Sequence, residues 1–120
     1  MLVTIKPADV AIRTVQFKGG TAGLLGDEYI EIVNRCGAPV AVDGWVVNDG
    51  DVGQDFTFPA GTTLAPGVPV RIYTNKVHPA WGGYSFNSMT GVWHDLGDTA
   101  EIRNKQGRAI ARYAYGNAAL

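Results

Sequence analysis

The chain lacks the features that mark a disulfide scaffold, a membrane protein or a strongly charged binder. Its only cysteine, Cys36, excludes an internal disulfide, and we expect a buried thiol there. No apolar run reaches the roughly 18 residues of a membrane-spanning helix, so none is predicted. Ten basic residues balance eleven acidic ones. That balance removes the simplest argument for nucleic-acid binding.

A secretion signal is also missing, because the first residues have neither an apolar core nor a small-residue cleavage site. We therefore expect a cytoplasmic protein, or a secreted one if a leader was removed before the chain was numbered. The 120 residues suit one domain. We expect an N-terminal extension or edge strand in residues 1–8, the folded domain in 9–116 and a C-terminal tail in 117–120.

Helical periodicity is absent too, and short β-branched and aromatic runs alternate with turn residues instead. Sixteen glycines and six prolines separate these runs. About seven to nine strands at roughly ten-residue spacing predict an all-β fold, a β-sandwich.

Two segments change their apolar face part-way along, which an uninterrupted strand cannot do. In residues 9–17 the change predicts a bulge near Arg13–Thr14. In residues 40–48 it falls at Asp43–Gly44, where a glycine bulge would turn four residues toward the core: Val40, Val42, Trp45 and Val47. In residues 28–34, Ile30 and Ile32 share one face, and we expect the face of Glu31 to meet water.

The aromatic residues are predicted to divide between core and surface. By their parity and flanking turns, four belong to the core: Trp45, Phe56, Phe58 and Trp93. The long irregular segment 75–91 holds Trp81, Tyr84 and Phe86. Exposed, these would form a binding patch; buried, they would fasten the segment down. We expect Tyr84 and Phe86 to be buried and Trp81 to be at least partly exposed.

No catalytic site is predicted. His94 and Asp95, with Ser85 or Ser88 nearby, are the best candidates for a hydrolytic triad, but neighbouring side chains on an extended chain point in opposite directions. The acidic residues Asp49, Asp51 and Asp55 have the spacing of a calcium loop, but no glutamate closes it, so they remain weak metal candidates. We expect no cofactor.

A basic group falls on the final predicted hairpin, which turns at residues 104–107. It consists of Arg103, Lys105, Arg108 and Arg112. We expect Arg103 and Arg108 to face each other across the turn, which is unfavourable without a counter-anion. The group would either contact nucleic acid or be a solvated edge that opposes aggregation.

Several segments, taken in order, resemble the lamin tail domain, especially its bacterial branch. They read DEYIEIVN from residue 27, VDGWVV from 42, FPAGTTLAPG from 58, YSFNSMTGVW from 84 and GDTAEI from 97, followed by the NKQG turn and a closing strand with Tyr113 and Tyr115. The resemblance covers residues 9 to 116. The chain departs from the bacterial pattern at residues 94–96 and at Ala111.

The resemblance implies an immunoglobulin-like sandwich that acts as a non-catalytic binding or tethering module, with intermediate filament-like relatives. A protein partner or a second copy of the chain is the expected partner. Binding of nucleic acid through the basic hairpin, and a role as an accessory domain to a hydrolase, are the alternatives. The expected binding residues are Trp81, Tyr84, Phe86, Arg103, Lys105, Arg108 and Arg112.

Overall fold

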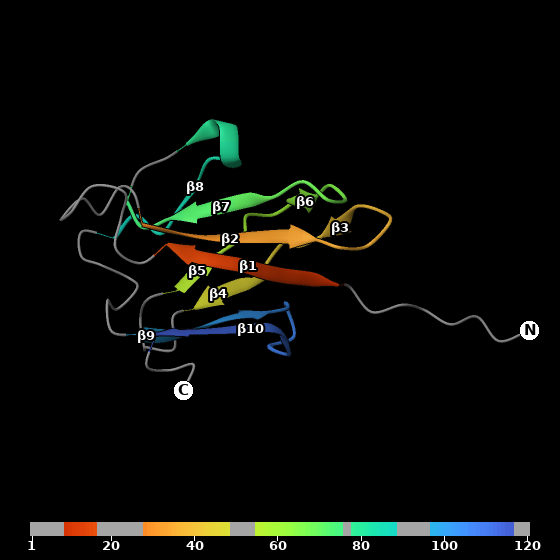
Figure 1. Ribbon diagram of the computed structural model, residues 1–120. Coiled ribbons are helices and arrows are strands. Elements are labelled where there is room, and N and C mark those ends of the chain that lie inside the picture. Colours follow the sequence, from red (N-terminus) through yellow and green to blue (C-terminus); the bar gives the residue numbers. More distant parts are fainter. Residues whose placement is uncertain (1–8, 17–27, 49–54, 76–77, 89–96, 117–120) are drawn as a thin grey trace, which may run out of the picture.

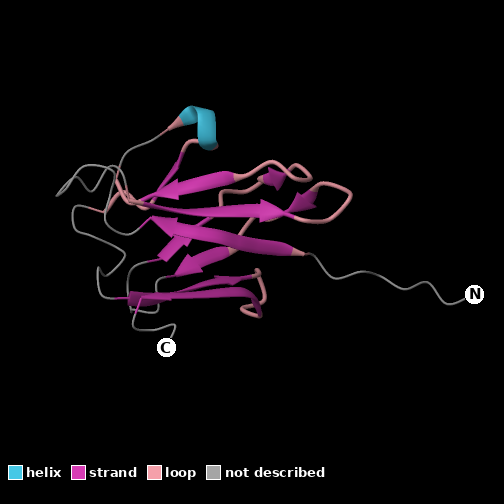
Figure 2. Ribbon diagram, in the orientation of Figure 1, coloured by secondary structure: helices cyan, strands magenta, loops and turns pink. Residues whose placement is uncertain are grey.

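The computed structural model describes residues 9–16, 28–48, 55–75, 78–88 and 97–116. Within these ranges the chain forms short strands and a 3₁₀ helix, Pro79–Trp81 (Figures 1 and 2). The strands are β1 Val10–Gln16, β2 Tyr29–Asn34, β3 Val40–Ala41, β4 Val46–Asn48, β5 Asp55–Thr57, β6 Thr63–Leu64, β7 Val70–Tyr73, β8 Tyr84–Ser85, β9 Gly97–Arg103 and β10 Ala109–Gly116.

Two four-stranded sheets enclose one core, so the predicted all-β sandwich is confirmed. The first sheet has the strand order β1-β2-β7-β8 and the second the order β10-β9-β4-β5. Strands β3 and β6 form a separate ribbon at one end of the sandwich (Figure 1). Neighbouring strands are antiparallel except β7 and β8, which are parallel.

The core follows the alternation of the strands. Ile30, Ile32 and Ile72 of the first sheet are fully buried, as are Val47 and Ile102 of the second. Burying a side chain of this kind contributes about 1.5–3 kcal/mol. The aromatic residues Trp45 and Phe58 join this cluster as predicted, and the half-buried Phe56 packs against it. Trp93 lies outside the described residues.

Strand β1 contains the predicted bulge. Its pairing with β2 shifts between Ile12 and Thr14, so Arg13 is the extra residue. The shift lets Ile12 and Val15, which have opposite parity, both reach the core. Phe17, the last residue of the predicted strand, lies outside the described residues.

The change of face at Asp43–Gly44 is a β-turn between two strands rather than a bulge within one. The amide of Trp45 donates to the carbonyl of Val42 at 2.9 Å, and Gly44 has a φ of 77°. That φ suits the third position of a type II turn. The chain leaves β3 here and enters β4 of the second sheet. All four residues face the core as expected, although Val40 is only half-buried.

Part of the segment predicted to be irregular, residues 75–91, forms regular structure. Tyr84 and Ser85 form β8, which pairs with the free edge of β7. The amide of Phe86 then donates to the carbonyl of Tyr73 at 2.7 Å. A two-residue strand is too short to show an alternation in sequence, which is why the prediction of an irregular segment was wrong at this point.

Candidate interaction surface

The outer face of the second sheet carries a row of polar side chains across all four strands. Register places Arg112 of β10 opposite Glu101 of β9, Glu101 opposite Asn48 of β4, and Asn48 opposite Asp55 of β5. We call these four residues the polar row. Its two ends, Arg112 and Asp55, are exposed. The row therefore presents a cation at the β10 edge and a carboxylate at the β5 edge.

Glu101 ties two arginines together within this face. Its Oε2 accepts a hydrogen bond from Nε of Arg112 at 2.6 Å, and its Oε1 accepts one from Nε of Arg103. Burial alone would raise the pKa of Glu101, but the hydrogen bonds and positive charges of Arg112 and Arg103 hold it below its ordinary value. Both arginines donate from Nε here, and a terminal nitrogen of Arg103, Nη1, donates to the carbonyl of Gly107 at 3.0 Å.

A shallow hollow of about 310 Å³ opens beside this bridge. It is lined by Asn48, Thr99, Glu101, Arg103 and Arg112. The two guanidiniums and one carboxylate give the hollow a net positive charge. Arginine forks of this kind bind carboxylates and other planar anions well.

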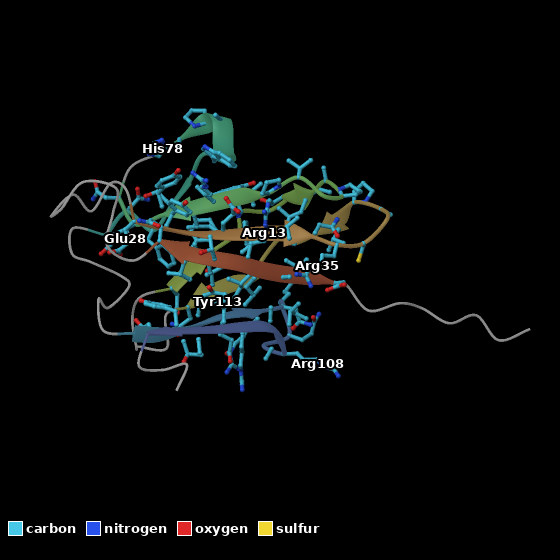
Figure 3. All side chains as sticks on the ribbon, viewed as in Figure 1. Arg13, Glu28, Arg35, His78, Arg108 and Tyr113 are labelled. Atoms are coloured by element: carbon cyan, nitrogen blue, oxygen red, sulfur yellow. The ribbon has the colours of Figure 1, made fainter. Side chains whose placement is uncertain are left out.

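The other two basic residues of the predicted group, Lys105 and Arg108, lie in the hairpin turn, whose Gly107 carbonyl accepts a hydrogen bond from Nη1 of Arg103 at 3.0 Å. Register places Arg103 opposite Ala109, and the amide of Asn104 donates to the carbonyl of Arg108, so the expectation that Arg103 and Arg108 face each other is wrong by one position. Arg108 is exposed at the turn (Figure 3). The stem of Lys105 passes over Gly44. The basic group is thus divided, and Glu101 offsets part of its charge.

The outer face of the first sheet is covered around Glu31 by the chain's own residues. Glu31 is only 7% exposed, so the expectation that its face meets water is wrong. Nε of Arg71 donates to Oε1 of Glu31 at 2.8 Å, and Nη1 of Arg13, the bulge residue, lies 3.6 Å from Oε2 of Glu31. Parity correctly placed Glu31 on the outer side, but it carries no information about what covers that side.

The cover consists of aromatic rings around Arg71. Its guanidinium lies 3.6 Å from the ring centroid of Trp81 and 4.1 Å from that of Tyr29. The hydroxyl of Tyr73 accepts a hydrogen bond from Nη1 of Arg71 at 3.1 Å, and the Tyr73 ring stacks on His78, with ring centroids 3.9 Å apart. Figure 3 labels His78 beside the 3₁₀ helix, on the side of the molecule opposite Arg108. We call this group, centred on Arg71, the arginine clasp.

Tyr84 and Phe86 have a different environment from Trp81. Both are half-buried and pack against the core beside Phe56, with ring centroids 5.8 and 6.0 Å from that of Phe56. These contacts join β8 of the first sheet to β5 of the second along one side of the sandwich. Trp81 is half-buried on the outside, against Arg71. The three aromatics of the segment therefore do not form one patch.

The profile of the family described as Lamin Tail Domain matches residues 4–117, nearly the whole chain. The chain belongs to the lamin tail domain family. The immunoglobulin-like sandwich and the family resemblance read from the sequence are confirmed. No curated protein matches the chain.

Lamin tail domains are a non-enzymatic family, and membership indicates a protein-interaction module. Of the candidate hydrolytic residues, the structure describes Ser85 and Ser88. The hydroxyl of Ser85 donates to the carbonyl of Asn75 at 2.9 Å and accepts from the amide of Asn87 at 3.0 Å. His94 and Asp95 lie outside the described residues. No helix in the described ranges is long and apolar enough to cross a membrane.

The weak metal candidates are only partly described. Asp55 accepts a hydrogen bond from the side-chain amide of Asn48, within the polar row. Asp49 and Asp51 lie outside the described residues. Across the ranges that the structure covers, no three histidine, cysteine or acidic side chains come together in a way that would hold a metal ion.

Sequence reasoning missed several residues of these surfaces, among them Glu101, Arg71 and Asn48. The alternation of β9 places Glu101 on the same face as Arg103, so the sequence alone could have predicted that the two side chains share a face. The contact of Glu101 with Arg112 needs the register of the hairpin. Cys36 was expected to be buried, but it is half-buried in the turn after β2, where its Sγ accepts from the amide of Asp9 at 3.1 Å.

Proposed function

We propose that this lamin tail domain binds another protein chain, without catalysis, through the open outer face of its second sheet. The contrast between the two outer faces supports the proposal. The first is covered by the arginine clasp, in which Glu31 and Tyr73 are buried. The second leaves Thr99, Arg103 and Arg112 exposed around a hollow.

The chemistry of this face suits a polar protein surface. Arg103 and Arg112 are held in place by Glu101, so little side-chain entropy remains to be lost when they contact an acidic group. Side-chain exposures of 49% for Arg103 and 65% for Arg112 leave both guanidiniums accessible. Arginine is also among the residues that most often dominate protein interfaces.

Site-specific photo-crosslinking tests the proposal. A photoreactive amino acid at Thr99, inside the hollow, should give a discrete protein adduct in the native host, and Arg112→Glu should abolish it. The matched control is the same photoreactive residue at Thr63, an exposed position on the β3–β6 ribbon. Equal labelling from both positions, or none from Thr99, would contradict the proposal.

Nucleic-acid binding by the same face is the alternative function, and a gel shift with the purified domain tests it. The purified domain should not shift DNA in a gel at low salt, because Glu101 offsets part of the positive charge around the hollow. A salt-sensitive shift that Arg103→Glu and Arg112→Glu both abolish would instead assign the face to nucleic acid.

A further inference from the structure

We infer that the polar row is a self-complementary contact, and that its partner is a second copy of this chain related by a two-fold axis. The inference rests on the proposed function and names the partner for that same face. It follows from the order of charges along the row. From β10 to β5 the row reads cation, carboxylate, neutral amide and carboxylate: Arg112, Glu101, Asn48 and Asp55.

Reversing this row and laying it on itself gives a favourable partner at every position. The cation of Arg112 meets the carboxylate of Asp55 in the second copy, and the same pair repeats at the other end. In the middle, the carboxylate of Glu101 meets the neutral amide of Asn48, again twice. A two-fold interface requires self-complementarity of this kind, because residue i contacts residue j and j contacts i.

The charges also select the direction of the axis. A two-fold axis parallel to the strands, between β9 and β4, reverses the row as described. An axis running across the strands along the row would place Glu101 directly against its own copy, and Arg112 against its own copy. Opposed like charges are unfavourable, so the axis parallel to the strands is the one that fits.

The neighbouring row along the same strands raises no conflict with this arrangement. Register aligns Ala109, Arg103, Val46 and Thr57 across the sheet. Reversal places Arg103 over Val46 of the second copy, where the aliphatic stem of the arginine can cover an apolar side chain. Ala109 then meets Thr57. No like charges are opposed in either row.

The end residues have bonding capacity left for a second copy. Arg112 uses Nε toward Glu101, and a guanidinium has five N–H donors. Asp55 accepts from Asn48 through Oδ1, and a carboxylate has about four lone-pair sites. The row spans about 14 Å, since neighbouring strands lie about 4.8 Å apart. A contact of this width belongs to the small, reversible class of interfaces.

Charge exchange between two variants tests the inference. In Arg112→Glu, a carboxylate faces Asp55 at both ends of the dimer; in Asp55→Arg, a cation faces Arg112 at both ends. Each variant alone should therefore self-associate at least about tenfold more weakly than the unmodified chain. In an equimolar mixture, each end of a mixed dimer pairs one cation with one carboxylate, so association should return to within about threefold of the original.

Sedimentation velocity over about 1 μM to 1 mM protein measures these association constants, a range that covers weak dimers. Higher salt should weaken the unmodified dimer, because exposed charge pairs are screened. The matched control is Arg35→Glu mixed with Asp9→Arg, two exposed positions outside the second sheet. Both control variants, alone or mixed, should associate as the unmodified chain does. Thermal unfolding of each variant confirms that it is folded.

The outcomes separate this inference from the proposed function. A monomer at every concentration, or a mixture no stronger than its parts, overturns the two-fold contact. If the crosslink from Thr99 then still gives an adduct with a different protein, the face binds protein and only the identity of the partner was wrong. If neither association nor adduct is seen, both proposals fail together.

Discussion

The guanidinium carbon of Arg71 lies 3.6 Å from the ring centroid of Trp81, and this contact fastens the 3₁₀ helix to the outer face of the first sheet. The same guanidinium donates to Glu31, so one side chain both pairs with a buried carboxylate and packs against the ring of Trp81. Burial alone would lower the pKa of Arg71, but its hydrogen bonds to Tyr73 and Glu31 raise it above the ordinary value. The guanidinium of Arg71 therefore stays protonated at physiological pH.

Removing the ring should weaken the fold. Trp81→Ala should lower the free energy of unfolding by about 1–2 kcal/mol, because a partly desolvated cation–π contact is lost. Trp81→Phe, which keeps a ring, should cost less. A double-mutant cycle with Arg71→Met, which removes the cation, followed by urea unfolding, should give a coupling energy of about 0.5–1 kcal/mol. A coupling near zero would show that the two side chains are merely neighbours.

Gly44 is needed for its backbone conformation. Its φ of 77° is disfavoured for any residue with a side chain, and an added Cβ would lie 3.3 Å from Cγ of Lys105. Gly44→Ala should therefore cost about 1–2 kcal/mol of unfolding free energy. Gly37→Ala is the matched control, because an added Cβ there meets nothing within 4 Å and its φ is not positive. Equal losses from both substitutions in urea unfolding would refute this reading of the turn.

The sequence predicted those parts of the fold that depend on alternation within one segment. The conflict of parity in β1 located the bulge at Arg13, and that in residues 40–48 located the change of direction at Gly44. Alternation within one segment does not predict which segments contact each other. Parity places Glu31 on the outer side of β2, but only the path of residues 78–81 brings Trp81 over that side.

The candidate surface shows the same division. The alternation of each strand puts Arg112, Glu101, Asn48 and Asp55 on outer faces, and the hairpin at 104–107 was predicted. The polar row itself depends on the registers of three strand pairs, one of them between β4 and β9, which are about fifty residues apart. Such long-range pairing is fixed by the packing of the whole sandwich and not by local pattern.

Glu101 should make stability depend on pH. Because its pKa in the folded chain lies below the ordinary value of 4.5, its stabilising contribution is present above that value and is lost as the pH falls through the folded pKa. The difference in unfolding free energy between the unmodified chain and Glu101→Gln should be constant near neutral pH and shrink below pH 4.5. Chemical unfolding of both proteins at a series of pH values measures it. A difference that does not change with acidification would mean that Glu101 gains nothing from Arg103 and Arg112.

Asn34 should be among the most sensitive polar positions, because it is fully buried and joins three segments. Its Nδ2 donates to the carbonyls of Ala38 and Leu64, both at 2.9 Å, and its Oδ1 accepts from the amide of Cys36 at 2.7 Å. Asn34→Ala leaves these backbone groups without their partner, which should cost about 2–4 kcal/mol of unfolding free energy.

Asn34→Asp distinguishes the hydrogen bond that Asn34 accepts from the two that it donates. The aspartate keeps an acceptor for Cys36 but loses both donors, and it places a carboxylate beside the carbonyls of Ala38 and Leu64. It should therefore destabilise at least as strongly as alanine, by urea unfolding at neutral pH. Thr63→Ala, at the exposed neighbour of Leu64, is the control and should change stability by less than about 0.5 kcal/mol. An aspartate variant close to the original in stability would show that the accepted bond from Cys36, and not the two donated bonds, holds the turn after β2 against the β3–β6 ribbon.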